Sequence, residues 1–201
     1  MNSLFSLSAV ILAGGASARM GAPKALLRWR GEPVAARLAR IFAEACGEAW
    51  IVLGHGAASV HAGLPVVRGA RVVVNPDPGR GMLSSLQCGL RAARGSAGVF
   101  FLPVDYPAIA GRTIAAMCEA WYRAPWTPIL APRHGGRRGH PVLVSRAVAG
   151  ELLRLDSGRP AHTVIRASEE RVRYVDVDDA AIHRDADDPE SFAALEREFG
   201  R

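Results

Sequence analysis

The chain has 201 residues, of which 49% are hydrophobic, and this supply of core residues excludes a globally disordered chain. No apolar run approaches the roughly 20 residues that cross a bilayer, so we expect no membrane segment and a cytoplasmic location. The net charge of +6 is spread along the chain, with no basic run interleaved with aromatics, which argues against nucleic acid as a partner and favours a small anionic ligand.

Short apolar runs alternate with segments of helical periodicity along the chain. The predicted strands cover residues 8–12, 49–53, 71–74, 98–102, 129–131, 141–144 and 172–177. The predicted helices cover residues 33–46, 82–93, 111–122, 147–155, 160–167 and 189–199. This alternation predicts an open, mostly parallel α/β sheet with helices on both faces. Without repeats or a linker, residues 1–201 are expected to form a single domain.

The three cysteines, Cys46, Cys88 and Cys118, have neither metal-binding nor redox spacing. We expect them to be small buried side chains in a reducing cytosol.

In open α/β sheets, ligands bind beyond the carboxyl ends of the strands. That rule selects four loops here, at residues 13–24, 54–56, 75–85 and 103–107, and each contains Gly, Asn, Asp or Ser. We expect the four loops to converge on one crevice.

The loop after the first strand has the composition of a phosphate site. Gly14 and Gly15 let backbone amides approach a polyanion, and Arg19 and Lys24 supply cations for a triphosphate. The spacing is neither that of a P-loop nor that of a dinucleotide fingerprint. A plain glycine-rich turn is the alternative, but the Arg-Met-Gly-x-x-Lys extension favours phosphate. Of the 25 basic residues only Lys24 is a lysine, and it falls in this loop.

Two acidic segments are candidates for a divalent metal ion. Asp105 lies just past the end of the fourth predicted strand, where a carboxylate can hold Mg²⁺ and leave other positions to phosphate and water, although a turn cap is the alternative. Asp188 directly precedes Pro189, which is the usual arrangement of an N-cap residue before a proline at the first helical position. Either Asp185 or Asp187 could reach the metal, and Asp185 is the favoured one.

These residues together resemble the molybdenum cofactor nucleotidylyltransferases, a branch of a group that includes sugar-phosphate enzymes. The signature loop LAGGxSxRMGxxK, here Leu12 to Lys24, is the most specific match. The others follow in the same order along nearly the whole chain: Asn75-Pro76, Gly81 to Leu86, Asp105-Tyr106-Pro107, Arg138 to Leu143 and Asp185 to Glu190.

The resemblance implies a Rossmann-like three-layer α/β/α fold with a mostly parallel central sheet, as in the nucleotide-diphospho-sugar transferases. It also implies Mg²⁺-dependent transfer of a nucleotide from a nucleoside triphosphate to the terminal phosphate of molybdopterin, with a recipient molybdoenzyme or its chaperone as a further partner. The nucleotide-binding residues would be Leu12, Ala13, Gly14, Gly15, Arg19, Lys24, Asn75, Ser84 and Ser85. The catalytic residues would be Arg19, Lys24 and Asp105, the acceptor-binding residues Arg138, Gly139 and His140, and the metal ligands Asp105 and Asp185.

The nucleotide base is indicated by two conflicting motifs. Guanylyl-transferring members usually read LAGG in the loop, as this chain does, whereas cytidylyl-transferring members read LAAG. The Gly-Met-Leu-Ser-Ser-Leu and Gly-His-Pro-Val-Leu segments instead look like the cytidylyl branch, in which Asn is common at the position of His140. We expect CTP, on the larger number of matches, with GTP as the alternative.

The expected reaction is an in-line attack of the acceptor phosphate on the α-phosphorus, with pyrophosphate as leaving group. The protein positions two anions and neutralises the charge that develops, so loss of Arg19 or Lys24 should cost about 10²–10³ in rate.

Two other functions remain open. A sugar-phosphate nucleotidyltransferase would use the same loop, because Arg133, Arg137 and Arg138 indicate only an anionic acceptor. A non-enzymatic nucleotide-binding or cofactor-delivery protein would bind nucleotide without forming pyrophosphate and without requiring Mg²⁺.

Overall fold

The structure is a computed structural model that describes residues 6–156 and 169–200. A central sheet has the strand order β10-β7-β9-β6-β1-β4-β5, with β8 paired to β7. Its strands are β1 (Leu7–Ala13), β4 (Ala49–Leu53), β5 (Ala70–Val74), β6 (Gly98–Pro103), β7 (Ile129–His134), β8 (Arg137–Arg138), β9 (Val142–Ser145) and β10 (Val172–Asp176). A separate two-stranded sheet pairs β2 (Arg28–Trp29) with β3 (Glu32–Pro33).

The sheet is mostly parallel. The β1–β4, β1–β6, β4–β5 and β7–β10 pairs are parallel, whereas β9 runs antiparallel to both of its neighbours, β6 and β7. Because β1 lies between β4 and β6, the loops that follow these three strands emerge at the same edge.

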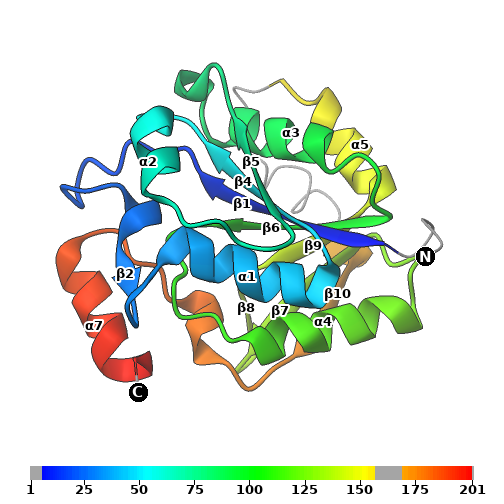
Figure 1. Cartoon of the computed structure of the whole chain (residues 1–201). Helices are drawn as coiled ribbons and strands as arrows, with labels where there is room; N and C mark the ends of the chain where they lie inside the picture. The colour runs from blue at the N-terminus through cyan, green and yellow to red at the C-terminus, as the bar shows by residue number, and fades with distance from the viewer. Residues whose placement is uncertain (1–5, 157–168, 201) are drawn as a thin grey trace.

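Helices cover both faces of the sheet (Figure 1). The α-helices are α1 (Val34–Cys46), α2 (Ala57–Gly63), α3 (Met82–Ala92), α4 (Gly111–Arg123), α5 (Arg146–Arg154) and α7 (Pro189–Phe199). Short 3₁₀ turns are η2 (Lys24–Leu26), η3 (Pro78–Arg80), η4 (Glu169–Arg171) and η5 (Ala180–His183). Helices α1 and α4 pack on the face that carries Ile11, and α3 and α5 pack on the face that carries Val10. Successive side chains of β1 point to opposite faces of the sheet and thus contribute to two hydrophobic cores, one on each face.

The helix ends follow their local sequence. Helix α1 begins directly after Pro33 and ends at Cys46, where Gly47, with a left-handed φ of 88°, caps it. Helix α7 begins after Asp188, whose side chain accepts a hydrogen bond from the Ser191 amide, so the predicted N-cap is confirmed. No helix within residues 6–156 and 169–200 is long and apolar enough to cross a membrane.

The expected α/β class with a mostly parallel sheet and two helical layers is confirmed. The strand prediction for 172–177 is one residue too long, and the predicted helix at 160–167 lies outside the described residues. The sequence reasoning missed α2 and the small β2–β3 sheet. Both are short, and α2 follows the Gly54-His55-Gly56 segment, so neither has enough residues for a clear periodicity.

Candidate active site

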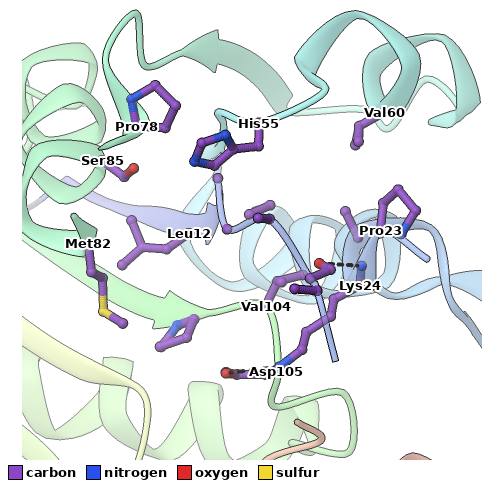
Figure 2. Close-up of a pocket in the computed structure, with 18 of the residues that line it drawn as sticks. Leu12, Pro23, Lys24, His55, Val60, Pro78, Met82, Ser85, Val104 and Asp105 are labelled. Carbon is purple, nitrogen blue, oxygen red and sulfur yellow. Dashed lines mark hydrogen bonds and ion pairs between the residues drawn. The ribbon is translucent and has the colours of Figure 1, made fainter. Parts of the chain in front are cut away.

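A cavity of about 670 Å³ lies where the loops after β1, β4, β5 and β6 converge. Its walls come from the first loop, from the segments after β4 and β5, and from Asp105 and Asp187. Figure 2 shows that Lys24 and Asp105 project toward each other from opposite walls. The four loops selected by the strand-end rule therefore meet at one crevice, as expected.

The loop after β1 is held in place by the loop after β4. The His55 amide donates to the carbonyl oxygen of Gly14, 3.2 Å away. A Cβ at Gly54 would lie 2.6 Å from that same oxygen, so only glycine permits this approach. Farther along, the Ser17 hydroxyl accepts a hydrogen bond from the Lys24 amide at 3.1 Å, which closes the loop over itself. The fold thereby fixes where Lys24 enters the cavity.

Lys24 is surrounded by carboxylates. Its Nζ lies 2.7 Å from Oδ1 of Asp187 and 3.7 Å from Oδ2 of Asp105, with 15% of its side chain exposed. Arg19 donates to the other oxygen of Asp187 at 2.8 Å, but 71% of the Arg19 side chain is exposed. The two cations of the first loop are thus paired with the acidic segment before α7, 163 and 168 residues away in sequence.

Burial and charge set the ionisation of these carboxylates. Desolvation raises the pKa of Asp105 to about 6 against the opposing effect of Lys24, and the neighbouring Asp185 and Asp187 add to the rise. The hydrogen bond from Lys24 holds the pKa of Asp187 below its ordinary value. Asp105 is therefore the carboxylate whose charge is most costly in the free protein, and an added cation would offset that cost.

The three carboxylates of Asp105, Asp185 and Asp187 form a site that suits a hard divalent cation. One oxygen from each lies within 4.8 Å of the others. Oδ1 of Asp105 is buried and has no hydrogen-bond partner among the described residues, so this oxygen is free to coordinate a metal ion. Carboxylate oxygens are the ligands that Mg²⁺ and Mn²⁺ prefer. These residues therefore fit a divalent metal, although the expected ligand pair lacked Asp187.

Asn75, Ser84 and Ser85 form a buried hydrogen-bonded group beside the cavity. The Asn75 amide nitrogen donates to both serine hydroxyls, at 2.8 and 3.0 Å, and its oxygen accepts from the Asp77 amide. Ser85 lines the cavity, whereas Asn75 lies behind it and is 4% exposed. Asn75 thus orients the start of α3, and Ser85 is the member of the group in position to meet a nucleotide.

The segment expected to bind the acceptor lies outside the cavity wall. Arg138 is exposed on β8, and the amides of Gly139 and His140 donate to the carbonyl oxygens of Pro132 and Ile182. The His140 ring packs 4.7 Å from the ring of Tyr106, and burial lowers the pKa of His140 to about 4. The segment reaches the acidic side of the site through Tyr106, which directly follows Asp105.

His55 and Met82 line the cavity and were missed as site residues. For His55 the signal was present, because the strand-end rule had already selected residues 54–56. Met82, which opens α3 with 62% of its surface exposed, likewise falls within the selected segment 75–85.

Comparison with known proteins identifies the family of the chain. A family model described as a MobA-like NTP transferase domain matches residues 9–172. The chain belongs to this family. Its membership confirms the resemblance read from the signature loop, and with it the expected enzyme class, an NTP-dependent nucleotidyltransferase.

Three relatives show the range of this MobA-like family. The nicotine blue oxidoreductase of Paenarthrobacter nicotinovorans is 30% identical over 197 residues, covering 94% of this chain and 96% of that protein. The molybdenum cofactor cytidylyltransferase of Escherichia coli is 25% identical, covering 96% and 97%. The Rv0371c protein of Mycobacterium tuberculosis, solved as a complex with manganese, has 27% identity and a TM-score of 0.74, covering 94% and 97%. The three-layer nucleotidyltransferase fold is thereby confirmed.

Proposed function

We propose that the protein transfers a nucleotide from a nucleoside triphosphate to the terminal phosphate of molybdopterin or its molybdenum cofactor and releases pyrophosphate. The observation that carries this proposal is the position of Lys24, whose ammonium lies 3.7 Å from the buried carboxylate of Asp105 inside a single cavity. A phosphate-binding cation and a metal-binding carboxylate at this separation can act on the same ligand.

The chain's own residues can bind and orient the triphosphate of the donor and the phosphate of the acceptor. Backbone amides of the glycine loop would hold the triphosphate, and Lys24 would exchange its contact with Asp187 for phosphate oxygens. Arg19 is on the solvent side and would take the outer phosphates, which leave as pyrophosphate. The acceptor phosphate would attack the α-phosphorus in line, so positioning and charge neutralisation account for the catalysis.

A divalent ion held by Asp105 together with Asp185 and Asp187 would supply charge stabilisation on the phosphate oxygens. Mg²⁺ is the proposed ion because it binds through one or two carboxylates and leaves its other positions to phosphates and water. The manganese complex of Rv0371c supports a divalent site in this fold.

We propose CTP as the donor and GTP as the alternative. The cytidylyl-like segments at Gly81 to Leu86 and at Gly139 to Leu143 favour CTP, whereas the LAGG loop favours GTP. The similarity to the cytidylyltransferase of Escherichia coli agrees with CTP, and the similarity to the guanylyltransferase of Xanthomonas euvesicatoria, 28% identical over 83% of this chain, agrees with GTP. Arg138, Gly139 and His140 are proposed to face the pterin, on the Tyr106 side of the site.

A second candidate function is oxidation or reduction of an organic substrate. The observation behind it is the 30% identity with an oxidoreductase across nearly the full length of both chains. The Lys24 ammonium beside the carboxylates of Asp105 and Asp187 favours phosphate and metal chemistry, which a hydride transfer does not need. Both functions predict a nucleotide in the same cavity, so they are separated by their products.

The test is pyrophosphate release from CTP, GTP and ATP in the presence of molybdopterin and Mg²⁺, with oxidation of NADH and NADPH measured in parallel. The proposal expects pyrophosphate release that depends on molybdopterin, is highest with CTP and is lost on chelation of the metal. Release with a sugar phosphate alone, nucleotide binding with no pyrophosphate, or turnover only of a reduced nicotinamide would each overturn it.

A further inference from the structure

Two cysteines that are 72 residues apart in the sequence lie side by side in the structure. Cys46 is the last residue of α1 and Cys118 lies in the second half of α4, and their Sγ atoms are 3.9 Å apart. The two helices run next to each other on one face of the sheet (Figure 1). This contact between the helices, not the spacing in the sequence, creates the pair.

The two thiols have unequal chemistry. Either sulfur can donate the hydrogen bond between them, but Cys46 ends α1, where the helix dipole opposes a negative charge, so Cys46 is the thiol that stays protonated when the pair loses one proton. That hydrogen bond lowers the pKa of Cys118 and raises the pKa of Cys46. Cys118 is therefore the better nucleophile, and Cys46 is positioned to react in a second step.

The pair lies at the floor of a surface hollow, with Cys118 itself 6% exposed. Cys118 lines a shallow hollow together with Ala115, Glu119, Tyr122 and Arg123, and Cys46 is itself half-buried. In the part of the chain that the structure describes, the acidic triad is the one group of three or more side chains that could hold a metal. The thiol pair is thus not part of a zinc site, which needs three or four protein ligands.

We propose that Cys46 and Cys118 form a reversible disulfide when the protein meets a peroxide. The Cys118 thiolate attacks one oxygen of hydrogen peroxide, which breaks the O–O bond, gives a sulfenic acid and releases hydroxide. The Cys46 sulfur then attacks the Cys118 sulfur, forms the S–S bond and displaces a second hydroxide. The two thiol protons convert both hydroxides to water, so two thiols are oxidised while one peroxide is reduced.

The geometry requires a modest movement. The two sulfur atoms must approach from 3.9 Å to about 2.05 Å, which side-chain rotation with a small shift of α1 against α4 can supply. The bond would close a loop of 72 residues and join the two helices of one layer. By restricting the unfolded chain, it should raise the melting temperature by about 9–18 °C.

The experiment treats the purified full chain with hydrogen peroxide, alkylates the remaining thiols and maps the peptides by mass spectrometry. We expect a Cys46–Cys118 cross-linked peptide, an alkylated Cys88, and return of both thiols after dithiothreitol. In thermal melts, Cys88→Ser should keep the peroxide-induced rise, whereas Cys46→Ser and Cys118→Ser should each lose it.

The peptide map of the wild-type protein needs no variant, so it decides the matter even where a substitution impairs folding. Alkylated Cys46 and Cys118 at a peroxide dose that oxidises Cys88 would overturn the proposal. So would Cys118 oxidised to sulfinic acid beside a free Cys46. None of these readouts depends on the transferase activity, so this proposal and the proposed function can fail separately.

Discussion

Replacement of Lys24 by alanine should change turnover and metal affinity in opposite directions. In the free protein the Lys24 ammonium lies 2.7 Å from Asp187 and 3.7 Å from Asp105, so it occupies the neighbourhood of the proposed metal ion. A charge of +1 and a charge of +2 about 4 Å apart repel by about 2 kcal/mol even at the dielectric constant of water. Lys24→Ala should therefore tighten Mn²⁺ binding without nucleotide by about 10- to 30-fold.

The same variant should lose about 10²–10³ in turnover at saturating nucleotide, because a preorganised, mostly buried cation is no longer present to stabilise the phosphates. Manganese binding can be followed by electron paramagnetic resonance at pH 8, where Asp105 with its pKa of about 6 is ionised. Turnover is followed by pyrophosphate release. Low salt is required for the binding measurement, since salt screens the repulsion.

The matched control is Arg91→Ala, which removes the same charge from the exposed side of α3, outside the cavity. It should alter neither quantity by more than about twofold. Unchanged or weaker manganese binding by Lys24→Ala would refute the charge argument, and wild-type turnover would refute the catalytic role of Lys24.

Three further predictions follow from the same structure. The structure lowers the loss expected for Arg19→Ala from the 10²–10³ inferred from sequence to about tenfold in kcat/KM for the nucleotide, because the 71% exposed guanidinium is screened by water. A loss as large as that for Lys24→Ala would contradict this. Gly54→Ala should abolish nucleotide binding in calorimetry, because the added Cβ would lie 2.6 Å from the carbonyl oxygen of Gly14. Gly15→Ala should fold normally, since no described atom lies within 4 Å of its added Cβ. The buried His140 has a folded-state pKa of about 4, below its ordinary 6.5, so the unfolded chain binds the extra proton and the free energy of unfolding should fall by up to about 3 kcal/mol as pH drops from 6.5 to 4. Urea unfolding of His140→Asn should show a correspondingly flatter pH dependence, and equal slopes would show that His140 does not carry this effect.

The sequence predicts the parts of the site that depend on local patterns. Buried strands that end in Gly, Asn or Asp locate the crevice, and the loop from Leu12 to Lys24 identifies its phosphate side. The sequence could not decide whether Asp185 or Asp187 assists the metal, because two carboxylates separated by one residue offer the same local chemistry. The difference lies in a contact across 163 residues, where Asp187 binds Lys24.

The cysteines illustrate the same limit of sequence patterns. Their spacing resembles neither a redox motif nor a metal motif, yet packing of α1 against α4 brings Cys46 and Cys118 into contact. Ridge-and-groove packing between helices depends on the whole sheet below them, so no window of sequence contains this information. The role of Asn75 also depends on contacts that a sequence pattern does not show. Its position after β5 indicated a ligand contact, whereas in the fold its side-chain amide donates hydrogen bonds to Ser84 and Ser85.

The charges in the cavity account for the order of events in the proposed reaction. Three carboxylates face Arg19 and Lys24, which leaves one net negative charge when Asp105 is ionised. A triphosphate alone would meet a site that repels it and whose two cations are already paired with Asp187. A divalent ion held by these carboxylates would reverse the sign of the site and would compete with Lys24 for them, which would free the ammonium for phosphate. Under the proposed function, metal and nucleotide should therefore favour each other's binding, because each would offset the charge that opposes the other.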